Sequence, residues 1–344
     1  MKKKILVDAR MIGGVGHGIG NYVLDMAAAL SERDLPFELH YLVAKGSNSP
    51  LRNLPHRESS VRFLHPLEAW KLPKELEGFH LFHSPSFMSL ASYPCAHVQT
   101  VHDLNHLHYG NPIHKLYYQR LLFPSLQKAK AIISVSETAA KELRDWLWAK
   151  GEGKVVEIAY NAISEPEPAE IGTLEKLGLK KFFFCLSNPK PHKNLSFLET
   201  AHANAWDQGD CLPLALSTSG PYQEGIFRTG PLGPAQIAAL FQGAHALLFP
   251  SLYEGFGRPP LEAALSGCTP IVSDIPVHRE VLAGVRETEF LDPRDTKAWE
   301  EAFLRLSKGG RPAVSAQSQS WIRETYSRKK LGDKMEKIYR EALS

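Results

Sequence analysis

Short apolar runs alternate along the chain with longer segments in which apolar residues recur at helical spacing. The runs are typical of buried strands, and the periodic segments between them are typical of amphipathic helices. In the first half we expect strands at Lys4–Ala9, Glu38–Val43, Val61–Leu64, Leu81–His83, His97–Val101, Ala131–Val135 and Val155–Ala159. We expect helices in this half at Tyr22–Leu30, Lys115–Ala129 and Thr138–Trp148. Because strands and helices alternate, this half is predicted to be an α/β fold with a doubly wound parallel sheet.

The same alternation returns in the second half of the chain. There we expect strands at Lys181–Leu186, Leu214–Leu216, Ala246–Phe249 and Thr269–Val272, and helices at Trp321–Tyr326 and Lys330–Ala342. The segment Ile163–Glu170 between the halves is acidic, contains two prolines and shows no apolar period, which is typical of a linker. We therefore expect two Rossmann-like domains, at residues 1–163 and 164–322.

Length and composition agree with two domains. A chain of 344 residues with 43% hydrophobic residues can bury two cores. No apolar run reaches the length that a membrane-spanning helix needs. We expect the basic N-terminus to lead into a first buried strand and not to be a secretion signal, because Asp8 and Arg10 interrupt the apolar run that follows it.

Charge and cysteine usage narrow the function class further. A net charge of +3 argues against a large nucleic-acid surface, so no nucleic-acid partner is expected. The four cysteines are far apart and form no C-x-x-C pair. Reduced, buried thiols in a cytoplasmic protein are the simplest explanation of this pattern.

The most informative segment runs from Pro250 to Ala264. It joins an expected strand to an expected helix, with one glycine on each side of Phe256 and two prolines at the start of the helix. Free backbone N–H groups and the helix dipole make such a helix start a site for phosphate. The carboxylates of Glu254 and Glu262 suit the hydroxyls of a sugar or ribose attached to that phosphate. The alternative is an ordinary strand–helix turn with a glutamate in the first helical turn.

These residues spell E-G-F-G-x-P-x-x-E-A, which resembles the E-x7-E signature of the retaining glycosyltransferases of family four. The family has the GT-B fold, in which two Rossmann-like domains face a central cleft. The resemblance implies that Glu254 contacts the transferred sugar and Glu262 the nucleotide ribose. It also implies that the terminal residues 323–344 cross back to the first domain. The donor-binding amides it implies are those of Gly255, Phe256 and Gly257.

Arg258 departs from the family pattern, which commonly has an apolar residue at this position. Its guanidinium either helps to hold the donor diphosphate or is solvated.

A second cluster follows the strand expected at Lys181–Leu186. Lys193 lies at a helix start, where the helix dipole disfavours a cation, so it is expected to face an anion. A solvated surface lysine is the alternative. The family places an arginine five residues before this lysine, and both side chains hold the diphosphate. Here that position is Asn188, which can donate a hydrogen bond to the phosphate but cannot neutralise it.

The glycine-rich segment Gly13–Gly20 does not match the dinucleotide fingerprint G-x-G-x-x-G, because Ile19 stands where the third glycine is needed. The glycines indicate either a close approach of the backbone to a ligand or a purely structural turn. The stretch from Gly18 to Val23 resembles the G-x-G-R-Y-V start of the family's first helix. In the family this loop faces the donor, which implies that Gly18 and Ile19 bind it.

Three histidines lie close together after the strand at His97–Val101. Metal ligation would require His102, His106 and His108 to converge on one point, and nothing in the sequence indicates this. We therefore expect no metal. The resemblance implies that His102 points into the cleft and hydrogen-bonds the donor sugar as charge develops at the anomeric carbon. His106 and His108 match no family position, and a surface role or an acceptor-side role remains open for both.

Three weaker segments also match the family. Ser136 lies in a V-S-x-x-T step, where it is expected to cap a helix rather than take part in chemistry. Leu232 lies in the loop that lines the base pocket in relatives. Glu280 stands where relatives have a glutamate close to the donor ribose or sugar, although an exposed carboxylate at a helix start is an equal alternative.

The resemblance as a whole implies a retaining hexosyltransferase that needs no metal and no other cofactor. The expected substrates are a nucleotide-sugar donor and a glycan or lipid-linked acceptor. The Asp8-Ala9-Arg10 opening and the first-helix motif are similar to those of bacterial mannosyltransferases of polysaccharide assembly, which favours GDP-mannose. A UDP-sugar 2-epimerase of the same fold and a non-catalytic sugar-nucleotide binding protein are the alternatives.

The helix expected near Ile113–Phe123 mixes aromatic and aliphatic residues with cations. Such a helix could lie on an anionic membrane surface and present a lipid-linked acceptor. The alternative is a helix that buries its apolar face in its own domain. Pro112 and Pro124 predict that it is short or kinked.

Overall fold

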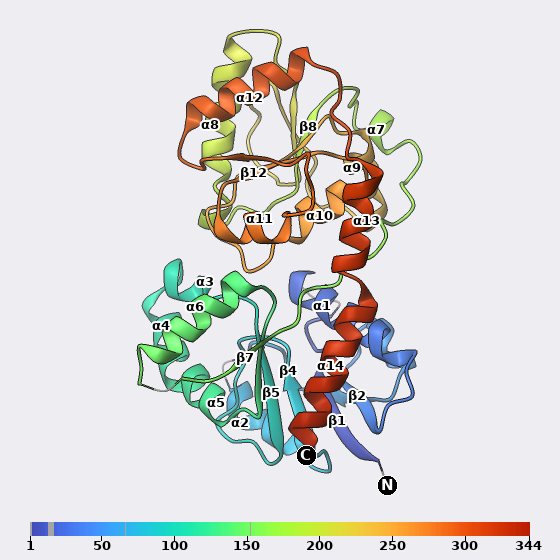
Figure 1. Cartoon of the computed structure of the whole chain (residues 1–344), viewed down its shortest axis with the longest axis vertical. Coiled ribbons are helices and arrows are strands. Elements are labelled where there is room, and N and C mark those ends of the chain that lie inside the picture. Colours follow the sequence, from blue (N-terminus) through green and yellow to red (C-terminus); the bar gives the residue numbers. More distant parts are fainter. Residues whose placement is uncertain (1, 13–16, 66, 152) are drawn as a thin grey trace. The chain divides into compact units, whose positions relative to one another are not determined.

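The computed structural model describes residues 2–12, 17–65, 67–151 and 153–344 (Figure 1). It divides into two compact units. Unit 1 comprises Met1–Ala162 and Tyr326–Ser344, and unit 2 comprises Ile163–Thr325. The sequence places its boundaries at 163/164 and 322/323, close to the divisions of the structure at 162/163 and 325/326. The two parallel-sheet units confirm the predicted α/β class.

Unit 1 is built on a seven-stranded sheet of order β3-β2-β1-β4-β5-β6-β7 in which neighbouring strands are parallel. The strands are β1 Lys3–Asp8, β2 Phe37–Ala44, β3 His56–Ser59, β4 Leu81–Ser84, β5 Ala96–Val101, β6 Ala131–Ser134 and β7 Val156–Ile158. The α-helices are α1 His17–Ser31, α2 Glu68–Lys71, α3 Asn105–His108, α4 Pro112–Tyr117, α5 Phe123–Lys128, α6 Glu137–Trp148 and α14 Arg328–Leu343. A π-turn at Tyr118–Leu122 joins α4 to α5, so the helix expected at Lys115–Ala129 is interrupted, as its prolines predict.

Unit 2 is built on a six-stranded parallel sheet of order β10-β9-β8-β11-β12-β13. Its strands are β8 Phe183–Cys185, β9 Leu214–Leu216, β10 Ile226–Arg228, β11 Leu247–Phe249, β12 Pro270–Ser273 and β13 Glu289–Leu291. Its α-helices are α7 Thr173–Lys176, α8 Leu195–Asp207, α9 Pro234–Gly243, α10 Arg258–Leu265, α11 Pro276–Val281, α12 Thr296–Lys308 and α13 Ala316–Thr325.

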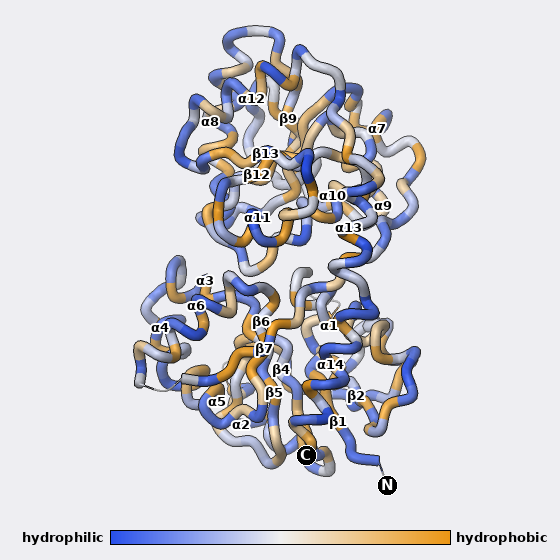
Figure 2. The backbone as a smooth tube through the Cα atoms, viewed as in Figure 1, coloured by the Kyte–Doolittle hydropathy of each residue, from blue (hydrophilic) through white to orange (hydrophobic). Residues whose placement is uncertain are grey.

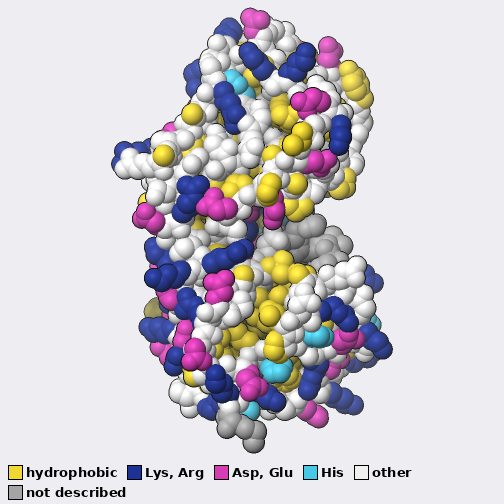
Figure 3. Space-filling view, turned by 90° about the vertical axis from the view of Figure 1, so that its right-hand side faces the viewer, with side chains coloured by type: hydrophobic (Ala, Val, Ile, Leu, Met, Phe, Trp, Pro, Cys, Tyr) yellow, Lys and Arg dark blue, Asp and Glu magenta, His cyan; other side chains and the backbone are white. Residues whose placement is uncertain are grey.

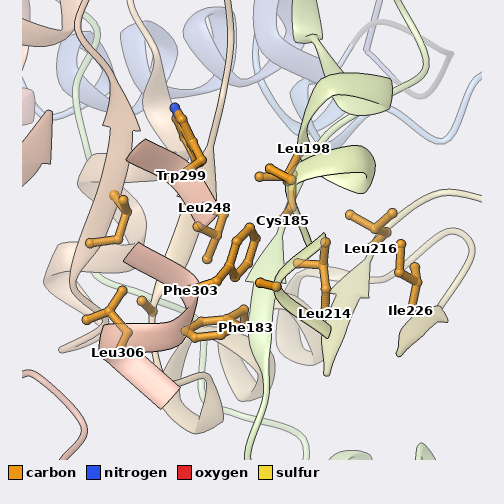
Figure 4. Packing of buried hydrophobic residues seen from close by; sticks show 14 residues of the cluster. Phe183, Cys185, Leu198, Leu214, Leu216, Ile226, Leu248, Trp299, Phe303 and Leu306 are labelled. Carbon is orange, nitrogen blue, oxygen red and sulfur yellow. The ribbon is translucent and has the colours of Figure 1, made fainter. Parts of the chain in front are cut away.

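The core of unit 2 lies between the sheet and the helices α8 and α12, which pack against each other (Figure 4). Trp299 and Phe303 of α12 are fully buried against Phe183 of β8 and Leu248 of β11. Both faces of a parallel sheet are covered by helices, so these strands carry nearly continuous apolar sequence. This is why the sequence locates the central strands well.

The strand expected at Val61–Leu64 is wrong. The third strand is instead β3 at His56–Ser59, a polar segment at the edge of the sheet. An edge strand pairs on one side only, so the apolar pattern that identifies central strands is weak there. The edge strands β10 and β13 of unit 2 escape sequence analysis for the same reason.

Val61, Leu64 and Glu68, which follow β3, are held around a buried guanidinium. Arg10 donates from Nη2 to Asp8 (2.8 Å) and Glu68 (3.2 Å), and from Nη1 to the carbonyl of Val61 (2.9 Å). Glu68 also accepts the backbone N–H of Leu64 (3.1 Å), whose φ is 60°. Burial, with Asp8 adding to it, raises the pKa of Glu68 to about 7 although Arg10 opposes the shift. The segment after β3 is therefore shaped by charge pairing and not by a sheet.

The terminal helix α14 belongs to unit 1. In Figure 1 it is the red helix beside α1, and Figure 2 shows hydrophobic and hydrophilic residues alternating along it. Its buried face includes Leu331, Met335, Ile338 and Tyr339. Arg33, which follows α1, pairs with Asp333 of α14 (2.8 Å) and fixes the register of the two helices.

Candidate functional site

The order of strands in unit 2 marks one place where loops diverge. From β8 the chain moves to β9 and β10 on one side of the sheet, and then to β11, β12 and β13 on the other. The loops that follow β8 and β11 therefore leave the sheet in opposite directions at neighbouring carboxyl ends. In open α/β sheets, ligands bind at such a switch point.

Two charged side chains meet at this switch point. Lys193, in a short 3₁₀ turn after β8, donates to Glu254, in the loop after β11, with 2.5 Å between Nζ and Oε1. Their side chains are only 14% and 12% exposed. The Lys193 ammonium also lies 5.6 Å from the centre of the Phe249 ring. The anion that faces Lys193 in this structure is therefore the carboxylate of Glu254.

The local backbone explains how these side chains reach each other. Asn194 ends the 3₁₀ turn in the left-handed region (φ 57°), a conformation that asparagine tolerates better than most residues. The backbone N–H of Leu252 donates to the carbonyl of His192 (2.8 Å), which ties the loop after β11 to the loop after β8.

The Glu254 carboxylate is ionised at neutral pH. Burial alone would raise the pKa of Glu254, but the charge and hydrogen bond of Lys193 hold that pKa below its usual value. A buried carboxylate is costly unless it is paired, so each partner stabilises the charged form of the other.

The glycine loop leads directly into α10. Gly257 has φ 88° and precedes the first helical residue, so a side chain at this position would strain the backbone. Phe256 is buried and anchors the loop in the core. At the start of the helix, Arg258 donates from Nε to Glu262 (3.0 Å). The predicted ribose-binding carboxylate thus has a cation beside it.

His278 is a site residue that sequence analysis missed. It is fully buried on α11, donates from Nδ1 to the carbonyl of Ser273 (2.8 Å), and lies 5.5 Å from the Phe249 ring. Its Nε2 has no hydrogen-bond partner among the described residues and faces Gly257. Burial lowers its pKa, so the ring is neutral. Its place on an apolar helix face with Val277 and Val281 is the sequence signal that could have identified it.

Of the other predicted donor-binding residues of unit 2, Asn188 and Leu232 lie on loops and Glu280 lies on a helix. Asn188 is exposed after β8, where its side-chain oxygen accepts the backbone N–H of Lys190 (3.3 Å). Leu232 is half-buried between β10 and α9, and Glu280 is half-buried on α11. Within the predicted set, the structure joins Lys193 to Glu254 and Arg258 to Glu262 by hydrogen bonds.

Unit 1 holds the remaining predicted residues. His102 directly follows β5, and its Nε2 donates to the carbonyl of Pro85 (2.9 Å). Gly18 is exposed and Ile19 half-buried in the first turn of α1. The rest of the glycine-rich segment, residues 13–16, lies outside the described residues.

The histidines near His102 have separate neighbours. His106 packs against the rings of Phe87 and Tyr118, and His108 pairs with Glu142. Within the described ranges, no group of three or more His, Cys, Asp or Glu side chains is arranged to hold a metal ion. Ser136 caps α6 by accepting the backbone N–H of Ala139 (3.0 Å), which confirms its predicted capping role.

Two protein-family models match the chain. "Glycosyltransferase Family 4" matches residues 16–164, and "Glycosyl transferases group 1" matches residues 215–328. The first match includes His102 of unit 1. The second includes Glu254 of unit 2, the partner of Lys193.

Curated relatives are bacterial mannosyltransferases. The O-antigen chain mannosyltransferase RfbU of Salmonella typhimurium is 26% identical over 223 residues, which span 61% of this chain and 60% of that protein. The O-antigen chain mannosyltransferase B of Escherichia coli is 26% identical over 299 residues, or 79% of this chain and 74% of that protein.

Solved structures share the fold. The structure of Anabaena HepE in complex with UDP and glucose gives a TM-score of 0.73 at 15% identity, over 98% of this chain and 99% of that one. Sucrose-phosphate synthase from Thermosynechococcus elongatus gives a TM-score of 0.71 at 15% identity, over 98% of both chains.

We predict that Lys193 and Glu254 are strongly coupled in the free protein. Lys193→Met should lower the free energy of unfolding because it leaves a carboxylate unpaired in a site that excludes most water. Adding Glu254→Gln should recover part of the loss, with a coupling energy of about 1 kcal/mol or more in a double-mutant cycle followed by urea denaturation. The exposed pair Lys141–Asp145 is the matched control and should show coupling close to zero. Additive effects at Lys193 and Glu254 would contradict the prediction.

Proposed function

The chain belongs to the glycosyltransferases of GT-B fold, and we propose that it transfers a hexose from a nucleotide sugar to a glycan or lipid-linked acceptor. We further propose that the reaction retains the anomeric configuration and needs no metal. The observation that carries this proposal is the Lys193–Glu254 pair beside a glycine loop and helix start, at the switch point of the sheet.

Donor binding would exchange the partner of Lys193. The α10 start offers backbone N–H groups and a helix dipole to a diphosphate, and Lys193 lies at the neighbouring strand end. A phosphate that takes the ammonium would release the Glu254 carboxylate, which could then accept hydrogen bonds from sugar hydroxyls. Asn188 carries no charge, so Lys193 would supply most of the positive charge that opposes the departing diphosphate.

The chemistry follows from what these groups can do. The bond between the anomeric carbon and the phosphate oxygen breaks while the acceptor oxygen bonds to the same face of the sugar. The acceptor's proton passes to the departing phosphate oxygen. In the proposed complex Glu254 accepts hydrogen bonds from sugar hydroxyls instead of attacking the anomeric carbon, which is consistent with this direct same-face route. His102 would hydrogen-bond the sugar as positive charge develops. Lys193 and the backbone N–H groups at the start of α10 would oppose the charge of the departing diphosphate, as a metal ion does in other transferases.

GDP-mannose is the first donor to test, because the curated relatives are mannosyltransferases of O-antigen chains. UDP-glucose is the main competitor, since structures of the same fold bind UDP and glucose. An isomerase of the same fold would turn over a nucleotide sugar without an acceptor, and a non-catalytic binding protein would turn over none.

We predict that one nucleotide sugar is hydrolysed slowly by the purified protein, with GDP-mannose the most active of a panel that includes UDP-glucose. The rate should not change in EDTA, because Lys193 and the α10 amides supply the positive charge. Release of the nucleoside diphosphate checks both points. Proton NMR of the glycoside formed with an acceptor checks the retained anomeric configuration, because a glycoside, unlike a free hexose, does not mutarotate. Conversion to an epimer would favour the isomerase. Loss of activity in EDTA that a metal restores would contradict metal independence.

The helix α4 bears on where the acceptor binds. None of the helices that the structure describes is both long and apolar enough to cross a bilayer. On α4, however, Ile113 is 73% and Leu116 54% exposed, and His114 and Lys115 between them are exposed as well. The π-turn and α5 that follow bury Leu122 and Leu126, so this segment both anchors to unit 1 and presents an apolar, cationic turn.

We therefore propose peripheral contact between α4 and an anionic membrane at the inner face, where a lipid-linked acceptor would be reached. Figure 3 shows one face of the molecule, on which cations and carboxylates are interspersed. The exposed apolar pair would insert at the interface while the cations meet lipid headgroups.

We predict cosedimentation with phosphatidylglycerol-rich vesicles that weakens as salt is added. Replacing Lys115 and Arg120 by Glu, or Ile113 and Leu116 by Ser, should reduce the bound fraction severalfold. The matched control is Lys141→Glu with Arg144→Glu on α6, which should bind like wild type. No sedimentation with vesicles at low salt would leave a soluble glycan end as the acceptor.

A further inference from the structure

A ring of buried contacts joins α14 to the centre of unit 1. Tyr339 of α14 lies 2.6 Å from Nδ1 of His83 on β4, and Nε2 of His83 lies 2.8 Å from the hydroxyl of Thr100 on β5. Thr100 lies 3.3 Å from the hydroxyl of Tyr22 on α1, which donates to the sulfur of Met335 on α14 (3.7 Å). We call these five residues the polar ring. Its first and last members, Tyr339 and Met335, lie one helical turn apart on α14.

Every member of the polar ring is fully buried. Burial, together with the nearby His102, lowers the pKa of His83 to about 3, so its imidazole is neutral under all physiological conditions. A neutral imidazole has one donor and one acceptor nitrogen, and each faces a hydroxyl that can serve in either role. Because Tyr22 donates to Met335, Thr100 donates to Tyr22 and accepts from Nε2 of His83, and Tyr339 donates to Nδ1. The ring is therefore satisfied with the proton of His83 on Nε2. A buried polar network that is fully satisfied favours one arrangement of the elements that carry it.

The polar ring holds the two strand ends that position His102. Pro85 lies two residues beyond His83, and His102 lies two residues beyond Thr100. The His83–Thr100 contact and the His102–Pro85 hydrogen bond therefore tie the same pair of strands at successive levels. In addition, the ring of Tyr22 meets the imidazole of His102 edge-on, with 5.0 Å between centres and 90° between planes.

We propose that Tyr339 is a positioning residue for His102, acting through His83, Thr100 and Tyr22. The inference rests on the proposed function, in which His102 contacts the donor sugar. The terminal helix thereby sets the orientation of a catalytic imidazole that is distant from it in sequence. In this proposal His83, Thr100 and Tyr22 do not contact the substrate. They act by holding the ends of β4 and β5 in place and by setting the ring of Tyr22 against His102.

The test is Tyr339→Phe in the full chain, compared with Tyr41→Phe, a buried tyrosine of β2 that lies outside the polar ring. Tyr339→Phe should lower kcat about tenfold or more, with a smaller change in KM for the donor, because a misaligned group is felt mainly in the transition state. Tyr41→Phe should leave kcat close to wild type. In a His102→Ala background, adding Tyr339→Phe should have little further effect, because the two residues act in series.

Equal kcat values for Tyr339→Phe and Tyr41→Phe, or multiplying losses in the double variant, would overturn the proposal. If Tyr339→Phe does not fold, Thr100→Val and Thr100→Ser replace it, and only the valine should lower kcat.

Nitrogen-15 NMR of the histidine rings separates this inference from the proposed function. A shift of the His102 signal in Tyr339→Phe supports the positioning role even if the donor is misassigned, and an unchanged signal contradicts it.

Discussion

The Lys193–Glu254 pair is the constraint on which the site of unit 2 depends. Two opposite charges that are mostly removed from water stabilise the fold only while they face each other. The loops after β8 and β11 must therefore converge, although the sheet sends them in opposite directions. The left-handed Asn194 and the positive φ of Gly257 are the backbone conformations that allow this. In the proposed donor complex the Lys193 ammonium pairs with the diphosphate instead, and the Glu254 carboxylate accepts hydrogen bonds from the sugar hydroxyls.

Unit 1 uses buried polar contacts for a similar purpose. Arg10 fixes the segment that follows β3, and the polar ring fixes the ends of β4 and β5 against α14. In both units the apolar core determines which strands form and how they are ordered. The loops that carry polar chemistry are then placed by hydrogen bonds and ion pairs, each of which would be costly to leave unsatisfied.

The sequence predicts well what depends on local pattern. Central strands such as β9 match residue for residue, and the glycine loop after Glu254 joins a strand to a helix as its sequence predicts. The edge strand β3 is lost because its sequence is polar, whereas the more apolar edge strand β7 is found. Contacts distant in sequence leave no local signal, so neither the pairing of Tyr339 with His83 nor the place of His278 beside Gly257 could be inferred. The fold is therefore more predictable than the partners of its polar side chains.

The central claim is that a diphosphate replaces Glu254 as the partner of Lys193. Calorimetric titration of a nucleoside diphosphate tests it most directly. GDP, or the diphosphate of whichever donor proves active, is titrated into wild type, Glu254→Gln and Lys193→Ala. Glu254→Gln removes the competing carboxylate and should bind the diphosphate more tightly than wild type, while its sugar transfer falls. Lys193→Ala should bind more weakly, and its turnover should fall at least ~10²-fold, the scale for loss of one group that stabilises developing charge. Weaker binding in Glu254→Gln, or binding and turnover near wild type in a folded Lys193→Ala, would contradict the account.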